Sequence, residues 1–427
     1  MLAKPFDLVL HNAALRGVEG LRDVGVAGGR IAAIAPSLPP GTRSEDLGGR
    51  LVIPGFVDTH IHLDKSCLLS CCGTGDLKEA IRTVSALKKG FTVEDVRQRA
   101  QRTLEKAILQ GTTHMRTHVE IDPRIGLRSL EAILGLKRAY AFAIDLEICV
   151  FPQEGMTNDP GTEELLVEAL QRGADLLGGC PYTDSDPAAQ IARLFAIAVR
   201  FDVDLDFHLD FDLDPNGSHI GEVCRQTVAH GWGGRVAIGH ATKLSAMGPA
   251  AFQSAALTLV EAGVAVTALP STDLYLGGRD RLADRPRGIA PVHLLAERGV
   301  TASLATNNVL NPFTPFGDGS LLRMANLYAN TAQIGPAGFD ACLDLVTTDA
   351  AKLMRIPHYG IATGHPADLV VLDAPDAVLA LAEIAAPLMG FKRGRQTFVR
   401  PLARLLRPGD PVPAPEEAMP HLFAAET

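Results

Sequence analysis

The sequence lacks the features that mark membrane-spanning and secreted proteins. No apolar run approaches the roughly 20 residues that a membrane helix needs. Pro5 and Asp7 interrupt the apolar N-terminal stretch, so no signal peptide is predicted. The seven cysteines include no CxxC pair facing a second pair, which argues against a structural zinc site and favours free thiols in a reducing compartment. We therefore expect a cytoplasmic protein without a membrane partner.

Several common catalytic motifs are also missing. No GxGxxG or GxxxxGK[ST] follows the first strand-like segment, which argues against nucleotide-binding folds. HExxH, GxSxG and PCxxC are absent, although His118-Val119-Glu120 resembles the first half of the HxE…PCxxC zinc deaminase signature. The net charge of -9 provides no electrostatic reason to expect a nucleic-acid partner.

What the sequence does contain is a repeated strand–helix pattern from residue 52 onward. Apolar residues make up 47% of the chain, enough for a large core. Most predicted strands follow a helix that ends in glycine, as at Gln110-Gly111 and Ala262-Gly263. The pattern favours a (β/α)8 TIM-type barrel over an open sheet. The predicted strands are 52–61, 112–121, 145–151, 174–179, 202–209, 235–240, 263–269 and 299–305, and helices are predicted at 93–110, 128–141, 163–172, 186–201 and 249–262.

The two ends of the chain show short strand-like segments instead. Neither end alone has enough strands for a stable sheet, so we expect them to combine into one small β-sandwich. The predicted domains are 1–54 with 362–405 for the sandwich and 55–361 for the barrel, and 406–427 is predicted to be an extended proline-rich tail.

Histidines stand where four of the predicted barrel strands end. His60 and His62 are two apart on a strand and would project from the same face. Reactive side chains in such barrels gather at the carboxyl ends of the strands, where His208 and His240 also lie. His60, His62 and His208 together could bind one divalent metal ion, zinc or iron, with positions left open for water. Other polar residues at strand ends are His118, Glu120, Gln153, Asp210, Ser271, Asp273, Asn307 and Asn308.

A set of motifs resembles the amidohydrolase superfamily, and within it cytosine deaminase and the triazine-ring aminohydrolases. The motifs are HxH after VIPGFVD, FPQEG at 151–155, HLD at 208–210, GHATKLSAM at 239–247, LGGRD at 276–280 and NNVLNPFTPFGDG at 307–319. By resemblance, His60, His62 and His208 bind the metal, and His240 polarises the attacked centre or holds the metal water. Gln153 matches a glutamine that reads the amide edge of the heterocycle, and Phe313 matches an aromatic pocket position.

Two positions depart from the family pattern. The metal-binding, proton-accepting aspartate is Asn307 here, and the glutamate that protonates the ring in cytosine deaminase is Phe211. An amide cannot serve as a carboxylate base, and a phenyl ring carries no proton. Asp210 is the first candidate replacement and Asp212 the second, although Asp210 equally suits a structural role in the loop.

Three further polar residues lie near these strand ends, and one of them, Lys65, has two interpretations. Lys65 either orients water or substrate or is a solvated charge at a strand end. His118 and Glu120 are expected to make structural hydrogen bonds across the barrel mouth.

The sequence thus predicts a metal-dependent hydrolase of a C–N bond in a small nitrogen heterocycle, by deamination or by cleavage of a cyclic amide or urea. A metal-bound hydroxide would attack, with His240, Asp210, Lys65 and Asn307 as catalytic candidates and Gln153, Asn308 and Phe313 in substrate binding. The alternatives are a catalytically silent barrel that binds a heterocycle and a non-hydrolytic reaction such as elimination or isomerisation. A homo-oligomer is also expected.

Overall fold

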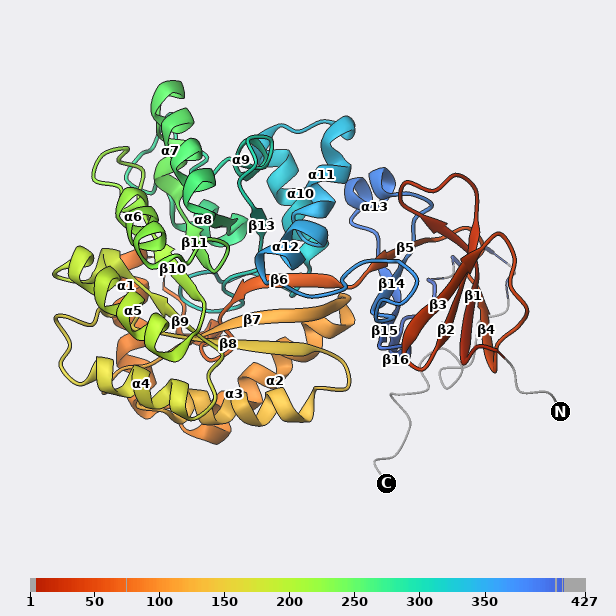
Figure 1. The fold of residues 1–427 in the computed structure, drawn as a ribbon, viewed down its shortest axis with the longest axis horizontal. Helices are drawn as coiled ribbons and strands as arrows, with labels where there is room; N and C mark the ends of the chain where they lie inside the picture. The colour runs from red at the N-terminus through yellow and green to blue at the C-terminus, as the bar shows by residue number, and fades with distance from the viewer. Residues whose placement is uncertain (1–4, 74, 404, 409, 411–427) are drawn as a thin grey trace.

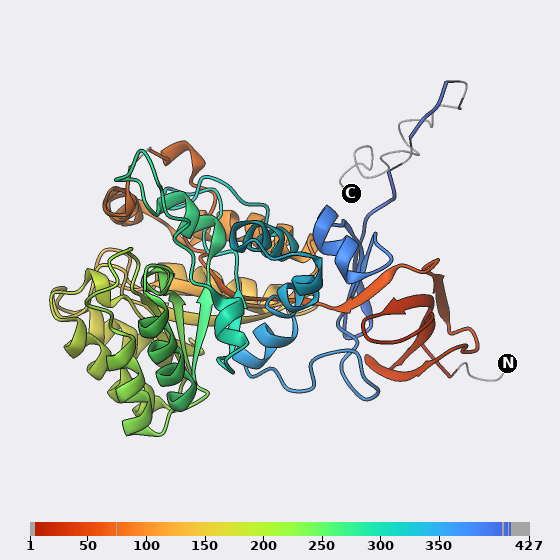
Figure 2. The same cartoon turned by 90° about the horizontal axis from the view of Figure 1, so that it is seen from above.

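A parallel barrel and a smaller sheet built from both chain ends lie side by side in the computed structural model (Figure 1). The structure describes residues 5–73, 75–403, 405–408 and 410. Most of the predicted C-terminal tail, residues 411–427, lies outside the described residues. Figure 2 shows the same two parts from above, with the terminal sheet beyond one end of the barrel.

The barrel consists of eight parallel strands in chain order. Two backbone hydrogen bonds complete the ring, from Asn307 N to His60 O at 2.8 Å and from His62 N to Asn307 O at 2.9 Å. The strands are β6 (Phe56–Ile61), β7 (Thr112–Glu120), β8 (Asp145–Phe151), β9 (Leu176–Gly179), β10 (Leu205–Leu209), β11 (Val236–His240), β12 (Val264–Ala268) and β13 (Ala302–Leu304).

Helices between the strands cover the outside of this ring (Figure 1). Their apolar faces pack on strands whose residues are nearly all buried, as they are throughout β7. Gly263 ends α7 with φ +67°, a left-handed conformation that glycine adopts without steric cost. The helices are α1 (Leu77–Leu87), α2 (Val93–Leu109), α3 (Arg128–Ala139), α4 (Thr162–Gln171), α5 (Pro187–Phe201), α6 (Ile220–His230), α7 (Pro249–Ala262), α8 (Pro270–Leu276), α9 (Val292–Ala296), α10 (Leu321–Ala332), α11 (Phe339–Asp344) and α12 (Thr348–Leu353).

The terminal sheet has the strand order β16-β15-β14-β5-β1-β2-β3, with β4 also beside β1. It is mostly antiparallel and encloses its own core, which includes Val24, Ile31, Leu369 and Phe391. The predicted fold class is therefore confirmed. The strands are β1 (Leu8–Leu15), β2 (Arg22–Ala27), β3 (Arg30–Ala35), β4 (Arg43–Asp46), β5 (Leu51–Pro54), β14 (Leu369–Leu372), β15 (Pro387–Lys392) and β16 (Arg395–Val399).

Two details differ from the sequence prediction. The single predicted strand 52–61 is two strands in two different sheets, separated by Gly55. Any side chain at Gly55 would collide with Thr113 of β7, so the chain crosses from one sheet to the other where only hydrogen fits. The C-terminal segment also contains a helix, α13 (Ala377–Glu383), where only strands were predicted; the side chain of Asp376 caps its first turn.

A buried lysine fastens the terminal sheet to the barrel. Lys392 of β15 is 1% exposed, and its Nζ donates to the carbonyl of Thr113 at 3.0 Å and to Asp368 Oδ2 at 2.7 Å. The same ammonium lies 2.9 Å from Asp145 Oδ2 at the start of β8. It therefore occupies the centre of the His114, Asp145 and Asp368 cluster, which leaves no place there for a metal ion.

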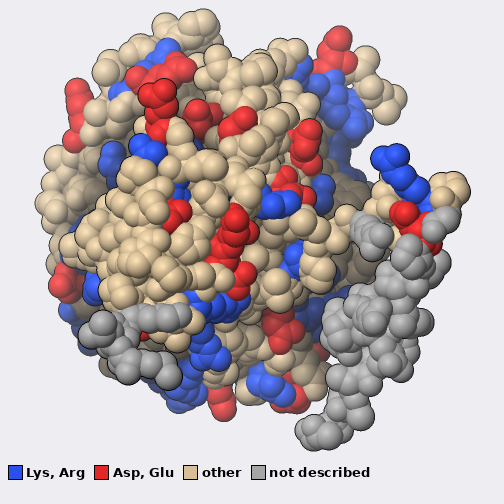
Figure 3. Space-filling model, turned by 90° about the vertical axis from the view of Figure 1, so that its right-hand side faces the viewer, with Lys and Arg blue, Asp and Glu red and all other residues tan. Residues whose placement is uncertain are grey.

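The surface offers no single-sign patch on the face drawn in Figure 3, where acidic and basic side chains are interspersed. Among the described residues, no helix is both long and apolar enough to span a bilayer.

Candidate active site

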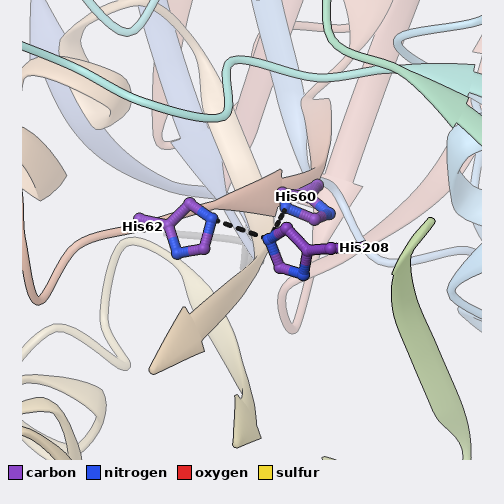
Figure 4. Close-up of side chains that lie close together, drawn as sticks. All are labelled: His60, His62 and His208. Carbon is purple, nitrogen blue, oxygen red and sulfur yellow. Dashed lines mark hydrogen bonds between the residues drawn. The ribbon is translucent and has the colours of Figure 1, made fainter. Parts of the chain in front are cut away.

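Three histidines from two strands converge at the carboxyl end of the barrel (Figure 4). His60 is the second-last residue of β6, His62 directly follows that strand, and His208 belongs to β10. The Nε2 atom of His208 lies 3.1 Å from that of His60 and 3.0 Å from that of His62. Burial and the neighbouring histidines lower the pKa of all three imidazoles, which keeps them neutral, the form in which histidine binds a metal.

The donor set fits one divalent metal ion. Ligands about 2.0–2.1 Å from a tetrahedral ion stand roughly 3.3 Å apart, close to the separation of these nitrogens. Within the described part of the chain, the three Nε2 atoms have hydrogen-bond contacts only with one another, so no other protein group occupies the place of an ion. The family pattern and this geometry together support a divalent metal.

Asn307 closes the barrel beside these histidines. Its backbone bonds to both His60 and His62, and its φ of +58° is a left-handed conformation that asparagine tolerates. Its side chain is fully buried, and neither Oδ1 nor Nδ2 has a partner among the described residues. An amide oxygen without a partner is available as an additional metal ligand. That Asn307 binds the metal stays a prediction.

His240 ends β11 next to the three histidines and has a carboxylate partner. Its Nδ1 lies 2.7 Å from Oδ1 of Asp273 in α8, and the other oxygen of Asp273 accepts from Leu269 N at 3.1 Å. Burial raises the pKa of Asp273, an effect that the imidazole of His240 partly offsets. Sequence reasoning noted Asp273 near a strand end and gave it no role, because its partner is 33 residues away.

A narrow cavity of about 10 Å³ adjoins His62, His208 and His240. Its lining combines polar side chains with apolar and aromatic ones. Such a mixture, in which a few polar groups stand among apolar and aromatic ones, is typical of small-molecule sites. The other lining residues are Lys65, Leu77, Gln153, Tyr182, Phe211, Thr272, Leu276, Asn308 and Phe313.

Lys65 and Gln153 meet inside this pocket. Lys65 Nζ donates to Gln153 Oε1 at 3.0 Å and to Glu120 Oε1 at 2.7 Å, and it lies 4.3 Å from the ring centroid of Phe313. The amide nitrogen of Gln153 faces Cys180 Sγ at 3.4 Å. Lys65 is buried in the pocket wall, so the expectation of a solvated charge does not describe its surroundings.

Asn308 and Phe313 lie on the loop after β13, and both line the pocket. The side chain of Asn308 accepts a hydrogen bond from Asn311 Nδ2 at 2.7 Å, and Asn311 Oδ1 accepts from the backbone of Phe313 at 3.0 Å. This loop therefore holds the amide and the aromatic ring in a fixed relation to each other.

Asp210 does not reach the pocket. Its Oδ2 accepts from Ser218 Oγ at 2.5 Å and its Oδ1 from His219 N at 3.1 Å, which ties the carboxylate to the loop before α6. The backbone turns at Asp210 with φ +53°, so the strand does not continue and the side chain leaves the face of His208. Asp212, the second candidate, pairs with Lys243 at 2.6 Å and is half-exposed.

Glu120, expected only to form a hydrogen bond, forms ion pairs with two buried lysines, Lys65 and Lys88. Burial alone would raise the pKa of Glu120, but the ammonium groups of Lys65 and Lys88 lower it to about 2. Lys88 had no predicted role, since its partners lie far away in the chain.

His118 stacks on His60 with the ring centroids 3.7 Å apart and lies 3.7 Å from Asp206.

Comparison with known proteins identifies the family of the chain. A sequence model described as the amidohydrolase family matches residues 43–398. The chain belongs to the amidohydrolase family. N-isopropylammelide isopropyl amidohydrolase of Pseudomonas sp. (strain ADP) is 29% identical over 413 residues, 92% of this chain and 98% of that protein. The crystal structure of 5-methylcytosine deaminase from Klebsiella pneumoniae with 5-fluorocytosine is 30% identical, with a TM-score of 0.89 over 94% of this chain and 100% of that one.

A third relative of this amidohydrolase, pterin deaminase of Rhizobium rhizogenes, is 29% identical over 83% of each chain. The predicted resemblance, the enzyme class and the general function of a hydrolase acting on C–N bonds in heterocycles are confirmed. The domain boundaries, the individual site residues, the cytoplasmic location, the homo-oligomer and the absence of a nucleic-acid partner stay predictions.

Proposed function

We propose that this amidohydrolase hydrolyses the exocyclic C–N bond of an oxo-substituted, six-membered nitrogen heterocycle of the aminopyrimidine or aminotriazine type. The observation that carries the proposal is that the Lys65–Gln153 pair lines the same small cavity as His62 and His208 of the histidine cluster. An ammonium and an amide suit the carbonyl oxygens and ring N–H groups of such a molecule. The relatives named for N-isopropylammelide and 5-methylcytosine support the same ring class.

His60, His62 and His208 would hold one divalent ion, zinc or iron, with Asn307 as a candidate fourth ligand. Once bound, the ion would supply Lewis acidity and lower the pKa of a water molecule towards neutrality. The convergence of the three Nε2 atoms supports this role.

His240 is the residue best placed to transfer a proton between the attacking water and the leaving amine. Asp273 accepts from Nδ1–H of the imidazole, which leaves Nε2 for the pocket. This pair takes the role for which Asp210 was considered, because the carboxylate of Asp210 is committed to Ser218 and His219.

The remaining pocket residues bind and orient the ring. Lys65, Gln153 and Asn308 face its polar edge, and Phe211 and Phe313 flank it with apolar surface. Phe211 also packs edge-on against His240, with ring centroids 4.4 Å apart, and thereby limits the access of water to the imidazole.

A second candidate is a barrel that binds a heterocycle without hydrolysing it, or that catalyses an elimination or isomerisation. The observation in its favour is that the lining of the pocket includes no carboxylate, with Phe211 and Asn307 at the two family positions. A reaction without net proton transfer to a leaving amine would not need one.

Turnover of a defined panel separates these candidates. Protein loaded with zinc or with ferrous iron would be incubated with N-isopropylammelide, ammelide, 5-methylcytosine and cytosine, and the release of ammonia or isopropylamine measured. Release from at least one oxo-heterocycle, lost in a His62→Ala variant, is the expected result. Tight binding without amine release from any compound would instead favour the second candidate.

A further inference from the structure

The carboxylate of Glu120 joins two buried lysines, one inside the pocket and one outside it. Its Oε1 lies 2.7 Å from Lys65 Nζ and its Oε2 lies 2.8 Å from Lys88 Nζ, and all three side chains are about 2% exposed. The backbone N–H of Glu120 donates to Asp64 Oδ2 at 2.9 Å, which fixes the end of β7. Each carboxylate oxygen thus serves one ammonium.

The direction of the Lys65 ammonium depends on these partners. An ammonium has three N–H donors, and Glu120 and Gln153 accept two of them. The ring of Phe313 lies against the same ammonium, and the side chain lines the cavity. A lysine stem has four rotatable bonds, so without the anionic partner the ammonium would have several buried orientations rather than one.

Lys88 holds Glu120 in this position from the other side. Its Nζ also lies 2.6 Å from Glu154 Oε2 and contacts Asp122, so it is surrounded by carboxylates. Lys88 directly follows α1, the helix whose first residue, Leu77, lines the pocket. Glu154 shares Lys88 with Glu120 but makes no contact with Lys65, which makes it a matched control.

We propose that Glu120 is a positioning residue that directs the ammonium of Lys65 at the oxo group of the heterocycle, with Lys88 as the counter-charge that keeps the carboxylate in place. The proposal rests on the proposed function, because it assumes an oxo-heterocycle in the cavity. It assigns Glu120 a part in substrate recognition through Lys65, although Glu120 itself is not among the residues that line the pocket.

A double-mutant cycle tests this assignment. Lys65→Met and Glu120→Gln would be made singly and together in the metal-loaded protein, and kcat and KM measured with the best substrate of the panel. Each single variant should lose about 10- to 100-fold in kcat/KM, the loss expected when a charged hydrogen bond to substrate is removed or misdirected. The double variant should lose no more than Lys65→Met alone, because Glu120 acts through Lys65.

The control and the stability check come from the same cluster. Glu154→Gln takes a carboxylate from Lys88 and Arg124 and leaves the partners of Lys65 in place, so its kcat/KM should stay within about twofold of wild type. Metal content should be equal in all variants. If Glu120→Gln does not fold, Glu120→Asp keeps the charge on a shorter arm and should raise KM in the same Lys65-dependent way. Losses that multiply in the double variant, or a Glu120 variant with wild-type kcat/KM, would overturn the proposal.

Binding of barbiturate, an anionic oxo-heterocycle, distinguishes failure of this proposal from failure of the proposed function. Calorimetry should show binding to the zinc-loaded wild type and a weaker affinity in Glu120→Gln and Lys65→Met, with Glu154→Gln unchanged. This pattern without turnover of any panel compound would overturn the hydrolytic function and support the positioning role. Turnover in the wild type with equal barbiturate affinity in all variants would overturn the positioning role alone. Absence of both turnover and binding would overturn both.

Discussion

His240 and Asp273 form a buried hydrogen bond of 2.7 Å at the edge of the cavity that His240 lines. It joins the end of β11 to α8, two elements that follow different strands of the barrel. The second oxygen of Asp273 is held by a backbone N–H, so the carboxylate cannot turn away from the imidazole. This relation fixes which nitrogen of His240 faces the pocket, and it supplies the carboxylate that the lining of the pocket does not contain.

Replacing this carboxylate should impair catalysis without removing the metal. The amide N–H of Asp273→Asn can donate a hydrogen bond to Nδ1 and thereby favour the wrong tautomer of His240, so kcat should fall by about 100-fold or more. Metal content should be unchanged, because Asp273 is not near the convergent Nε2 atoms. Asp212→Asn is the control, since it removes a half-exposed carboxylate that pairs only with Lys243 and backbone atoms. Steady-state kinetics and metal analysis of both variants check this prediction, and a full-rate Asp273→Asn enzyme would contradict it.

The three-histidine cluster should bind metal and be stabilised by it. Wild-type protein should take up one equivalent of a divalent ion, and a free concentration 1,000-fold above Kd should raise the free energy of unfolding by about 4 kcal/mol. His208→Ala removes the nitrogen that lies near both others and should abolish the uptake and the activity. His219→Ala changes a partly exposed histidine nearby and should have no effect on either. Metal analysis and thermal unfolding with and without chelator measure both outcomes.

Most of the barrel could be predicted because its signals are local. Each strand is a short apolar run, each helix has its own period, and glycine marks the junction between them, as at Gly263 before β12. The break at Gly55 was not predicted, because short apolar stretches, 51–53 and 56–57, stand on both sides of it and join different sheets. That choice depends on Thr113 and Asp368, which are distant in the chain.

The candidate site also contains residues that could be predicted from the sequence and residues that could not. His60 and His62 were identifiable from their spacing on one strand, and His208 and His240 from their place at strand ends. The partners that orient them were not, because Asp273 is 33 residues from His240 and Lys88 is 32 residues from Glu120. Asp210 had the right spacing from His208, but a left-handed turn of its own backbone redirects the carboxylate. A spacing of two residues predicts that two side chains point to the same face only when both residues belong to the strand.

The cluster of Lys88 with Glu120, Asp122 and Glu154 should make the free energy of unfolding depend on pH above the acid range. Burial and the charge of Glu120 raise the pKa of Glu154 to about 7, above its usual value near 4.5. The folded protein therefore binds more protons than the unfolded chain between these values, and stability falls as the pH rises from about 4.5 to 7. The full cost is on the order of 3 kcal/mol at neutral pH and above. Glu154→Gln should remove this dependence, and urea unfolding at pH 5 and pH 8 would detect it.

The outcome that contradicts this prediction is a difference in unfolding free energy between Glu154→Gln and wild type that is the same at both pH values. Glu163→Gln is the control, because Glu163 forms a surface ion pair with Arg193 and lies outside the cluster. Its effect on stability should be small and show little change with pH.

Cytosine should be a poor substrate of the wild-type enzyme because Phe211 stands where the ring-protonating glutamate is expected. Phe211 packs on His240 and lines the cavity, so Phe211→Glu would place a carboxyl group beside the bound ring. Together with Asn307→Asp, which adds an anionic group next to the histidines, it should raise kcat/KM for cytosine by about 100-fold. Phe211→Leu keeps the wall apolar and should give no such gain. Ammonia release from cytosine by the metal-loaded variants measures the effect.

The same pair of substitutions decides between the two proposed functions. A hydrolase that already uses His240 and Asp273 should turn over an oxo-heterocycle as wild type, and it should lose part of that activity when Phe211 becomes charged, because the apolar wall of its pocket is altered. A silent barrel should show no turnover as wild type and gain activity only when both carboxylates are restored. Efficient cytosine deamination by the unmodified protein would contradict both expectations, since the proton needed at the ring nitrogen would then come from a group other than residue 211.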